Sequence, residues 1–472
     1  MSLPPLIVDL DGSLIHADLL HESALRLVLE RPLDALRMPV WLLRGIASLK
    51  HEIASRVALD VSALPYNLPL LDWLRAQRAQ GRFLILATAS NLRYAQAVAD
   101  HLGLFDEIWA SDQRLNLKGP RKAERAIARF GERGYSYVGN DRADLPVWQT
   151  AAGAVPVNAG ASVMEQAAAL APIERSFAGK PPALPNLIKA MRLHQWLKNL
   201  LIVLPMFAAH SWSAASVQAV LLAGLAFCAL ASAIYLLNDM LDLGDDRLHP
   251  RKRLRPLAAG QLGLPQAGAA AFLLVLAAFG LASGLGPAFV QVLSAYLVLT
   301  LAYSITLKRL LMVDVLLLGA LYTLRIVAGS AAIGVPLSFW LLAFSMSLFG
   351  GLALLKRYGE LIDMRRRDCF IQAPGRGYHV GDIEMLASLG TAAAYGSVLI
   401  LALYINSSSV QTLYRQPHYI WLACPALWYW IARAWMLAHR GGMHDDPVLF
   451  AVRDRTSWVL LLVVMLAFGL AV

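Results

Sequence analysis

The sequence predicts a two-part protein in which an α/β domain with a parallel sheet precedes an all-helical membrane domain. In residues 1–170, apolar strand-like runs alternate with helical patterns, as in an ordinary globular α/β protein. From about residue 200 long apolar runs dominate, and the whole chain is 58% hydrophobic with a mean hydropathy of +0.53. That value excludes a protein that is soluble throughout. We expect an N-terminal domain at 1–170, a Pro-containing linker at 171–187 and a transmembrane domain at 188–472.

Polar side chains lie at or near the ends of the strand-like runs of the N-terminal part. The segments are LIVDLDGSLI, RFLILATAS, NLKG and YVGNDRAD, and their polar residues include Asp9, Asp11, Thr88, Lys118, Asp141 and Asp144. The carboxyl ends of parallel strands meet at one edge of a sheet. We therefore expect these side chains to gather there.

The four segments, in this order, resemble the motifs of the haloacid dehalogenase (HAD) superfamily of phosphatases over about residues 5–160. The resemblance implies a HAD-like Rossmannoid fold. It also implies that Asp9 is the nucleophile that forms an aspartyl phosphate and that Asp11 is the general acid and base. Thr88 and Lys118 would hold the phosphoryl group.

The same resemblance implies that Mg²⁺ is bound by Asp9, Asp11 and Asp144. The family pattern has an acid where this chain has Asn140, and Asp141 is the candidate substitute. A catalytically inactive regulatory domain is the alternative. The helical insertion between residues 14 and 69 fits the family's small cap. Within it, the segment Trp41–Leu42–Leu43 is interpreted as core, with a bilayer-facing surface as the alternative.

About nine membrane spans are expected in the second part. Their approximate limits are 195–211, 215–238, 266–284, 287–306, 312–333, 337–355, 385–404, 419–438 and 456–472. The loops between them alternate between nearly uncharged and rich in Lys and Arg. This bias predicts a multi-pass protein of the inner (cytoplasmic) membrane, with the basic loops, the N-terminal domain and the active sites in the cytoplasm.

The stretch NDMLDLGDDRLHPRKRLRPLAAG, residues 238–260, closes the second expected span. Its side-chain amide and three of its carboxylates recur at helical spacings of three, four and seven, which places them on one face: Asn238, Asp239, Asp242 and Asp246. Basic residues follow at Lys252, Arg253 and Arg255. Carboxylates beside a membrane need a cation, and oxygen ligands suit Mg²⁺. The stretch therefore predicts a Mg²⁺-bridged diphosphate site at a membrane face.

Other polar residues are expected on the same cytoplasmic face: Lys198, Tyr303, Lys308, Asp314, Arg325, Lys356 and Arg357. Arg325 follows Asp314 by about three helical turns, so both point the same way, and a guanidinium at that depth normally faces a polar cavity or a partner. The alternative for Lys356 and Arg357 is a snorkelling anchor. For Asp242 and Asp246 the alternative is a solvated loop with ion pairs to Arg247 and Arg251. The His444–Asp445–Asp446 segment is interpreted as an exposed polar loop.

Five segments of this part resemble the UbiA superfamily of intramembrane prenyltransferases, and within it the decaprenyl-phosphate phosphoribosyltransferase-like enzymes. They are RLHQWLKN at 192–199, NDxxDxxxD at 238–246, HPRKRLRP at 249–256, YSITLKRLLMVD at 303–314 and KRYGE at 356–360. The resemblance implies nine helices around a cytoplasm-facing cavity. It also implies transfer of ribose phosphate from phosphoribosyl diphosphate to a polyprenyl phosphate, with release of diphosphate.

In such an enzyme the carboxylates of the motif at 238–246 would hold Mg²⁺. Asp314 lies in a second aspartate motif that is incomplete here, because Leu318 occupies the place of its partner acid. The lysines and arginines named above on the cytoplasmic face, with Tyr303, would bind the phosphates of the two substrates. The N-terminal domain would then remove the 5-phosphate from the lipid-linked product.

Two other classes of function remain open. The first is an aromatic (quinone-precursor) prenyltransferase that uses a polyprenyl diphosphate, with a phosphatase domain of separate or regulatory purpose. The second is a membrane-tethered scaffold or transporter. Nucleic-acid binding is not expected, although the net charge is +10, because the basic residues flank spans and sit beside acids. The sequence leaves the oligomeric state and the length of the lipid open.

Overall fold

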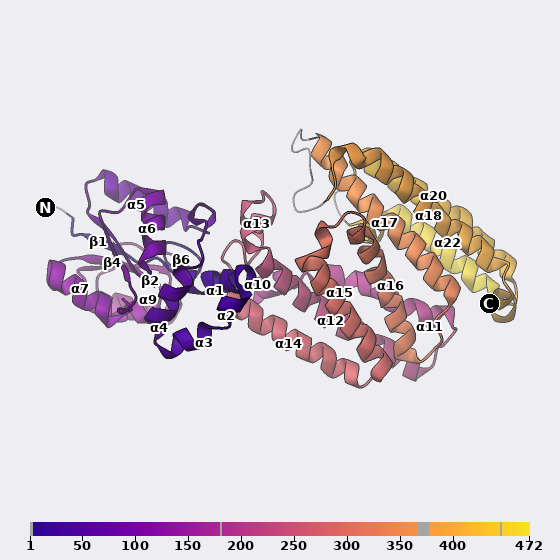
Figure 1. Ribbon diagram of the computed structural model, residues 1–472, viewed down its shortest axis with the longest axis horizontal. Helices are drawn as coiled ribbons and strands as arrows, with labels where there is room; N and C mark the ends of the chain where they lie inside the picture. The colour runs from indigo at the N-terminus through magenta and orange to yellow at the C-terminus, as the bar shows by residue number, and fades with distance from the viewer. Residues whose placement is uncertain (1–2, 180–181, 367–376, 444–445) are drawn as a thin grey trace. The chain divides into compact units, whose positions relative to one another are not determined.

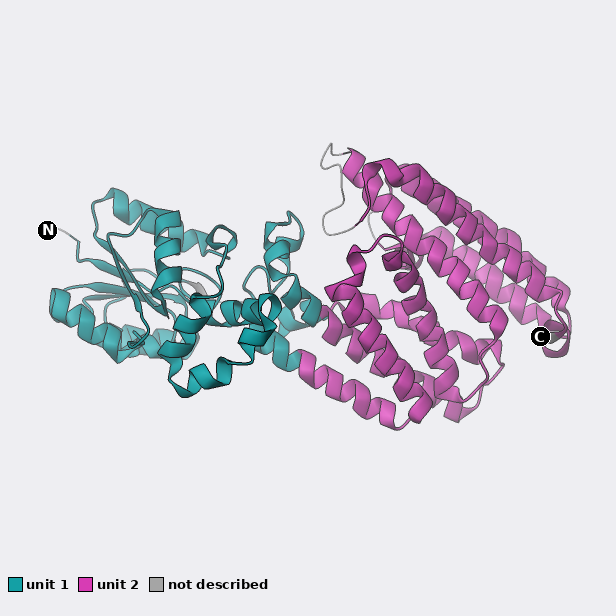
Figure 2. Ribbon diagram, viewed as in Figure 1, with its two compact units in different colours: residues 1–191, 236–270 teal, residues 192–235, 271–472 magenta. Residues whose placement is uncertain are grey.

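The computed structural model describes residues 3–179, 182–366, 377–443 and 446–472. It divides into two compact units, drawn in different colours in Figure 2. The first comprises residues 1–191 together with 236–270, and the second comprises 192–235 and 271–472. The segment after the second expected span therefore packs with the N-terminal part of the chain.

A six-stranded sheet forms the centre of the first unit (Figure 1). Its strands are β1 (Leu6–Val8), β2 (Leu84–Asn91), β3 (Glu107–Ser111), β4 (Ser136–Gly139), β5 (Gly153–Asn158) and β6 (Phe177–Gly179), in the order β3-β2-β1-β4-β5-β6. All neighbouring strands are parallel, and Leu6 of β1 lies between Leu84 and Ser136. The predicted parallel α/β sheet is confirmed. Part of the expected linker, β6, belongs to this sheet, whereas Lys180 and Pro181 lie outside the described residues.

Helices surround the sheet and form the cap insertion. The insertion contains α1 (Leu19–Glu30), α2 (Pro32–Ala35), α3 (Met38–Leu43), α4 (Ile46–Ala54) and the 3₁₀ turn η1 (Val61–Ala63). The remaining elements are α5 (Leu68–Ala79), α6 (Leu92–Leu102), α7 (Pro120–Phe130), η2 (Arg142–Asp144), α8 (Leu145–Thr150), α9 (Ala161–Leu170) and α10 (Ala183–Ala190).

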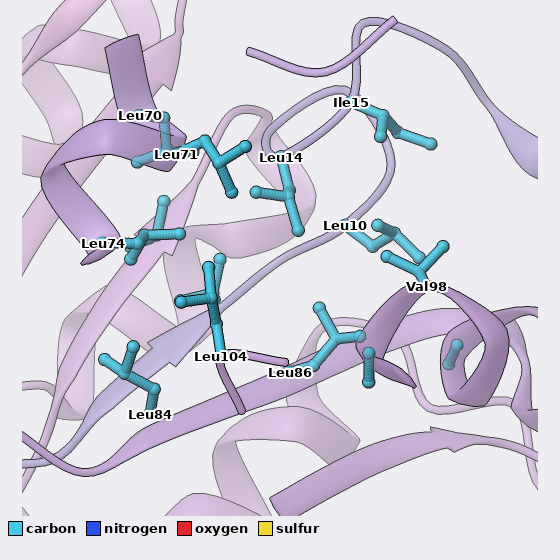
Figure 3. Close-up of a cluster of buried hydrophobic side chains, with 14 of the residues drawn as sticks. Leu10, Leu14, Ile15, Leu70, Leu71, Leu74, Leu84, Leu86, Val98 and Leu104 are labelled. Carbon is cyan, nitrogen blue, oxygen red and sulfur yellow. The ribbon is translucent and has the colours of Figure 1, made fainter. Parts of the chain in front are cut away.

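The core of this unit lies on both faces of the sheet, because successive side chains of a strand point to opposite faces. Leu6 and Val8 belong to one apolar cluster, which also contains Leu84 (Figure 3). Ile7 and Ile85 belong to the other. Each fully buried side chain of this kind contributes about 1.5–3 kcal/mol. This core fixes β1 and hence the loop that follows it.

The rest of the chain is helical. It contains η3 (Leu193–Val203), α11 (Leu204–Ala208), α12 (Ala214–Leu241), α13 (Leu243–Leu248), η4 (Lys252–Leu254), α14 (Leu264–Ser283), α15 (Pro287–Ile305), η5 (Leu307–Arg309), α16 (Val313–Ile333) and α17 (Phe339–Arg366). These are followed by η6 (Val380–Asp382), α18 (Ile383–Ile405), α19 (Ser408–Leu413), η7 (Pro417–Leu422), α20 (Ala423–His439), α21 (Pro447–Arg453) and α22 (Arg455–Ala471).

Among the described residues, six helices are long and apolar enough to cross a membrane, or seven if α21 and α22, bent by 86°, form one span. The expected count of nine is not confirmed. The expected first span, 195–211, folds as η3 and the short helix α11 instead of one long α-helix. The expected span at 419–438 is divided between η7 and α20, whose 17 residues would reach about 26 Å, less than the hydrocarbon thickness of about 30 Å.

Candidate active sites

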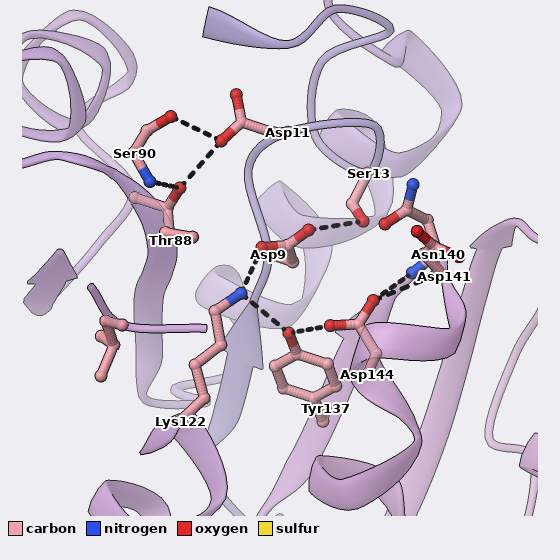
Figure 4. A network of polar contacts seen from close by, with 12 residues as sticks. Asp9, Asp11, Ser13, Thr88, Ser90, Lys122, Tyr137, Asn140, Asp141 and Asp144 are labelled. Carbon is pink, nitrogen blue, oxygen red and sulfur yellow. Dashed lines mark hydrogen bonds and ion pairs between the residues drawn. The ribbon is translucent and has the colours of Figure 1, made fainter. Parts of the chain in front are cut away.

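Two aspartates follow the central strand β1 at the carboxyl edge of the sheet (Figure 4). The backbone N–H of Asp9 still donates to Val138 of β4, at 3.0 Å, so the sheet fixes this residue. Asp11 lies beyond it and accepts hydrogen bonds from Thr88 Oγ1 at 3.0 Å and from Ser90 Oγ at 2.7 Å. Thr88 lies in β2, so two neighbouring strands bring these side chains together as the sequence predicted.

Asp9 is buried and has a cationic partner. Lys122 Nζ lies 2.5 Å from Asp9 Oδ1 and also donates to the Tyr137 hydroxyl at 3.1 Å. Ser13 Oγ donates to the second oxygen of Asp9 at 3.3 Å. Burial raises the pKa of Asp9 to about 7, against the lowering effect of the Lys122 charge. For Lys122, burial lowers the pKa, but the nearby carboxylates outweigh burial and leave it raised.

The lysine that contacts Asp9 is not the one that the sequence indicated. Lys118 lies in the loop before α7 and lines the cavity described below. Lys122, in the first turn of α7, reaches the carboxylate instead. A helix that begins at Pro120 turns Lys122 toward the sheet edge. Pro120 is typical of a helix start, but it does not indicate which lysine contacts Asp9.

Asp144 organises the turn after β4. Its Oδ2 accepts the backbone N–H groups of Asn140 and Asp141 at 2.8 and 3.1 Å, and its Oδ1 accepts the Tyr137 hydroxyl at 2.7 Å. Asp141 is exposed and accepts from the N–H of Arg142. The Asn140 amide approaches Gly12, where a Cβ would meet its Nδ2 at 2.2 Å.

No group of three or more His, Cys, Asp or Glu side chains in the described ranges is arranged to hold a metal ion. Metal binding by Asp9, Asp11, Asp141 and Asp144 stays a prediction.

A cavity of about 920 Å³ opens in front of the two aspartates. Its walls come from the sheet edge, from the cap and from the segment 243–266 that follows α12, and its lining includes Asp9, Lys118, Leu20, Ile46, Lys50, Leu243, Arg247, Leu257, Gly260 and Leu264. Residues far apart in the sequence thus enclose one site within the first unit.

The segment 243–266 is held against the cap by a buried ion pair. The Arg247 guanidinium donates to both carboxylate oxygens of Glu22, at 2.8 and 2.5 Å, and the two side chains are only 8% and 7% exposed. Gly260 packs nearby with a φ of +68°, and a Cβ there would lie 2.5 Å from His16 Cβ. A side chain at this position would therefore push the segment away.

The predicted diphosphate motif keeps its helical spacing. The N–H of Asp242 donates to the Asn238 carbonyl, and that of Asp246 donates to the Asp242 carbonyl, at 2.9 and 2.8 Å. Asp239 and Asp246 are buried, and Arg255 Nη1 lies 3.2 Å from the first and 2.5 Å from the second.

Asn238 and Asp246 each have a side-chain oxygen without a hydrogen bond. Among the described residues, Asn238 Oδ1 and Asp246 Oδ1 are buried and accept none, although Lys252 Nζ lies 3.8 Å from the latter. Burial raises the pKa of Asp246, against the opposing effect of Arg255. Buried oxygens with spare acceptor capacity fit a hard divalent cation. The remaining predicted cation, Arg253, is exposed.

In the second unit, Asp446 brings two predicted lysines together. Its Oδ2 lies 3.0 Å from Lys198 Nζ and 3.2 Å from Lys356 Nζ, and Tyr322 donates to its Oδ1 at 2.9 Å. Asp446 also accepts the N–H of Val448 at the start of α21. Its side chain is 10% exposed, so the interpretation of Asp446 as part of an exposed loop was wrong. His444 and Asp445 lie outside the described residues.

Arg325 is buried among acceptors of its own unit. Its guanidinium donates to Asn199 Oδ1 at 2.9 Å, to the Tyr296 hydroxyl at 2.9 Å and to the Leu321 carbonyl at 2.6 Å. Asp314 belongs to a different network, in which it accepts from Arg357 and Tyr378. Contact of Arg325 with a substrate phosphate stays a prediction.

Asp314 and Arg357 form a second buried network. Arg357 Nε donates to Asp314 Oδ2 at 2.6 Å, and the Tyr378 hydroxyl donates to Asp314 Oδ1 at 2.6 Å. Arg357 also donates to Glu360 and to the Tyr303 hydroxyl, at 2.7 and 3.0 Å. Both oxygens of Asp314 therefore accept protein donors, which favours a structural role over its predicted role as a metal ligand. Lys308 lies in η5, which follows α15.

Comparison with known proteins gives matches for both parts of the chain. A family model described as the UbiA prenyltransferase family matches residues 199–460. The uncharacterized protein y4nM of Sinorhizobium fredii is 38% identical over 99% of this chain and 91% of its own length. A decaprenyl-phosphate phosphoribosyltransferase of Mycolicibacterium smegmatis is 33% identical over 62% of this chain and 95% of its own length. A substrate-bound phosphoserine phosphatase structure covers 38% of this chain and 93% of its own, with 13% identity and a TM-score of 0.27.

Proposed function

Because the chain belongs to the UbiA prenyltransferase family, we propose that its membrane part transfers 5-phosphoribose from phosphoribosyl diphosphate to a polyprenyl phosphate. Diphosphate is the leaving group. The similarity to a decaprenyl-phosphate phosphoribosyltransferase supports this donor and acceptor over other substrates of the family. The cations beside Asp246 and beside Asp446 also suit multiply charged phosphates better than a neutral aromatic acceptor.

The departing diphosphate is assigned to the motif at 238–246. Cleavage at the anomeric carbon leaves negative charge on this group, and Arg255 and Lys252 are placed beside Asp246 to oppose that charge. Mg²⁺ would be held by the oxygens of Asn238, Asp239 and Asp246, and it supplies Lewis-acid stabilisation of the leaving group. The ion pair of Arg255 with Asp239 and Asp246 keeps the buried carboxylates in position before substrate binds.

The acceptor phosphate is assigned to the ammonium groups of Lys198 and Lys356. Both Nζ atoms lie within 3.2 Å of one Asp446 oxygen, so the carboxylate holds two cations close together. An anion that binds there gains from both charges. The acceptor is already an anion, so the reaction needs no strong base. Asp446 is therefore a positioning residue in this proposal.

The N-terminal domain is proposed to be a phosphatase that acts on the lipid-linked ribose phosphate. Asp9 attacks phosphorus, the bond from phosphorus to the ribose oxygen breaks, and Asp11 donates a proton to that oxygen. Lys122 reduces the repulsion between the nucleophile and the phosphate, because its ammonium lies at the carboxylate. Water then attacks the aspartyl phosphate and releases inorganic phosphate, with Asp11 as the base.

Sequential action is supported by helix α13, which contributes a residue to the phosphatase cavity and a residue to the diphosphate motif. Arg247 lines that cavity, and it directly follows Asp246 of the diphosphate motif in α13. One short helix thus carries a residue of each proposed site. Both sites are proposed to lie on the cytoplasmic side of the inner membrane, in line with the basic loops of the sequence.

The test is an assay of membranes with labelled phosphoribosyl diphosphate and a polyprenyl phosphate. A Mg²⁺-dependent labelled lipid should form with the normal chain and disappear in Asp246→Ala. The exposed Asp245 offers a matched control, since Asp245→Ala removes an acid that is not a proposed Mg²⁺ ligand and should keep activity. Asp9→Asn should accumulate the phosphorylated lipid. Reaction only with a polyprenyl diphosphate and an aromatic acceptor would overturn the proposal.

A further inference from the structure

The cap insertion exposes a cluster of large apolar side chains on α2, α3 and the residues beside them. Leu33, Leu36 and Leu43 are 80%, 77% and 89% exposed. Val40 and Leu42 are about half exposed. Single exposed leucines are ordinary on a protein surface, but five large apolar side chains between residues 33 and 43 are not. These five residues are the cap patch.

The cap patch is not part of a loosely packed core, because the insertion has a separate apolar core. Trp41 lies between patch residues in the sequence yet is buried with Leu27, Leu49 and Ile53. The Arg56 guanidinium lies 4.7 Å from the centroid of the Trp41 ring and closes that core on one side. The insertion therefore separates an inner apolar cluster from an outer one. The sequence interpretation of this segment as core holds for Trp41 and not for Leu42 and Leu43.

The border of the cap patch is basic. Arg31, Arg37 and Arg44 are exposed and flank it, and Asp34 is the one acid between residues 31 and 46 of the sequence. An apolar centre with arginines around it matches the boundary between headgroups and acyl chains of an anionic bilayer. The apolar side chains enter the boundary while the guanidinium groups meet lipid phosphates.

The candidate membrane spans of the same chain hold the N-terminal domain close to a bilayer. The same polypeptide carries six or seven candidate spans, so the N-terminal domain is tethered to a membrane and meets lipid at high effective concentration. Weak affinity of the cap patch is then enough for binding.

We propose that the cap patch inserts into the interface of an anionic membrane. Helix α4 begins at Ile46, three residues after Leu43, and its Ile46 and Lys50 line the phosphatase cavity. Insertion of the patch would therefore hold the mouth of that cavity at the lipid surface. The membrane contact does not depend on the proposed reactions, but it favours a substrate whose phosphate is attached to a lipid.

The test uses the full chain in lipid nanodiscs, with Cys228, Cys369 and Cys424 replaced by alanine. A fluorescent label is attached to Leu33→Cys or Leu43→Cys, and its quenching by brominated phospholipids is measured. The control is Leu68→Cys, at a 64% exposed leucine of α5, which Figure 1 shows on a different side of the domain from α3. Quenching at both patch positions should exceed that at the control about twofold or more in anionic discs, and should fall in neutral discs.

Charge reversal separates lipid binding from simple burial. Arg37→Glu with Arg44→Glu should lower quenching at Leu43→Cys while leaving transferase activity unchanged, because both arginines lie outside the proposed sites. Quenching at the patch equal to that at the control would overturn the proposal. So would a label that is shielded from water but not quenched by brominated lipid, since that result identifies protein, such as a second copy, as the cover.

Discussion

The ion pair between Glu22 and Arg247 gives the sharpest quantitative prediction. Both side chains are more than nine-tenths buried and the contact is bidentate. Two unit charges about 4 Å apart attract by about 4 kcal/mol at an effective dielectric constant of 20. Removal of one partner leaves the other charge buried without compensation, which costs about 3–5 kcal/mol. We expect Glu22→Ala to destabilise the packing of the segment 243–266 by about 3 kcal/mol.

Hydrogen exchange measures this change in the full chain. Each 1.4 kcal/mol, roughly, is a tenfold change in an opening equilibrium, so the amides of residues 243–260 should exchange about a hundredfold faster in Glu22→Ala. A double-mutant cycle with Arg247→Ala isolates the pair, because the second substitution should cost little once the first is made. Glu22→Leu with Arg247→Met should restore most of the protection. Exchange that changes less than about threefold in Glu22→Ala, or additive single effects, would refute the assignment.

Three further predictions concern the two proposed sites. Lys122→Met should lower the kcat of dephosphorylation by about 10²–10³, whereas Lys118→Met should lower it less, as steady-state phosphatase kinetics on the two variants would show; equal losses would contradict the assignment of Lys122. Asp446→Asn should reduce transfer by about tenfold or more and leave phosphatase activity intact, because it releases the two lysines that it holds; unchanged transfer would remove the lysine pair from the acceptor site. Burial raises the pKa of Asp9 to about 7, and only its ionised form is a nucleophile, so kcat/KM at low Mg²⁺ should fall about tenfold for each pH unit below that value; a profile that is flat from about pH 5 to 8 would rule this out.

The proposed phosphatase site shows what a strand pattern can and cannot predict. Asp9 and Asp11 directly follow an apolar strand, so their place at the sheet edge could be read from the chain itself. Lys122 could not, because its contact with Asp9 depends on the direction in which α7 leaves the loop. Asn140 and Asp141 are neighbours in the sequence, yet only the fold turns the amide toward Gly12 and leaves the acid exposed.

In the membrane part, too, some features could be predicted from the sequence and others could not. The spacing of Asn238, Asp242 and Asp246 was enough to predict one helical face, since local backbone hydrogen bonds produce that periodicity. Asp446 was interpreted as part of an exposed polar loop. Its contact with Lys198 joins residues 248 positions apart, and no local pattern carries such information.

The sequence alone determined the parallel α/β sheet, the apolar helical part and the family, because these follow from periodicity, apolar length and short motifs. The tertiary structure decided which charges meet. It paired Glu22 with Arg247, gave Asp9 the ammonium of Lys122 and held Lys198 beside Lys356 through Asp446. Each of these pairs brings buried charges together from distant segments, and a buried charge is stable only where the whole fold supplies its partner.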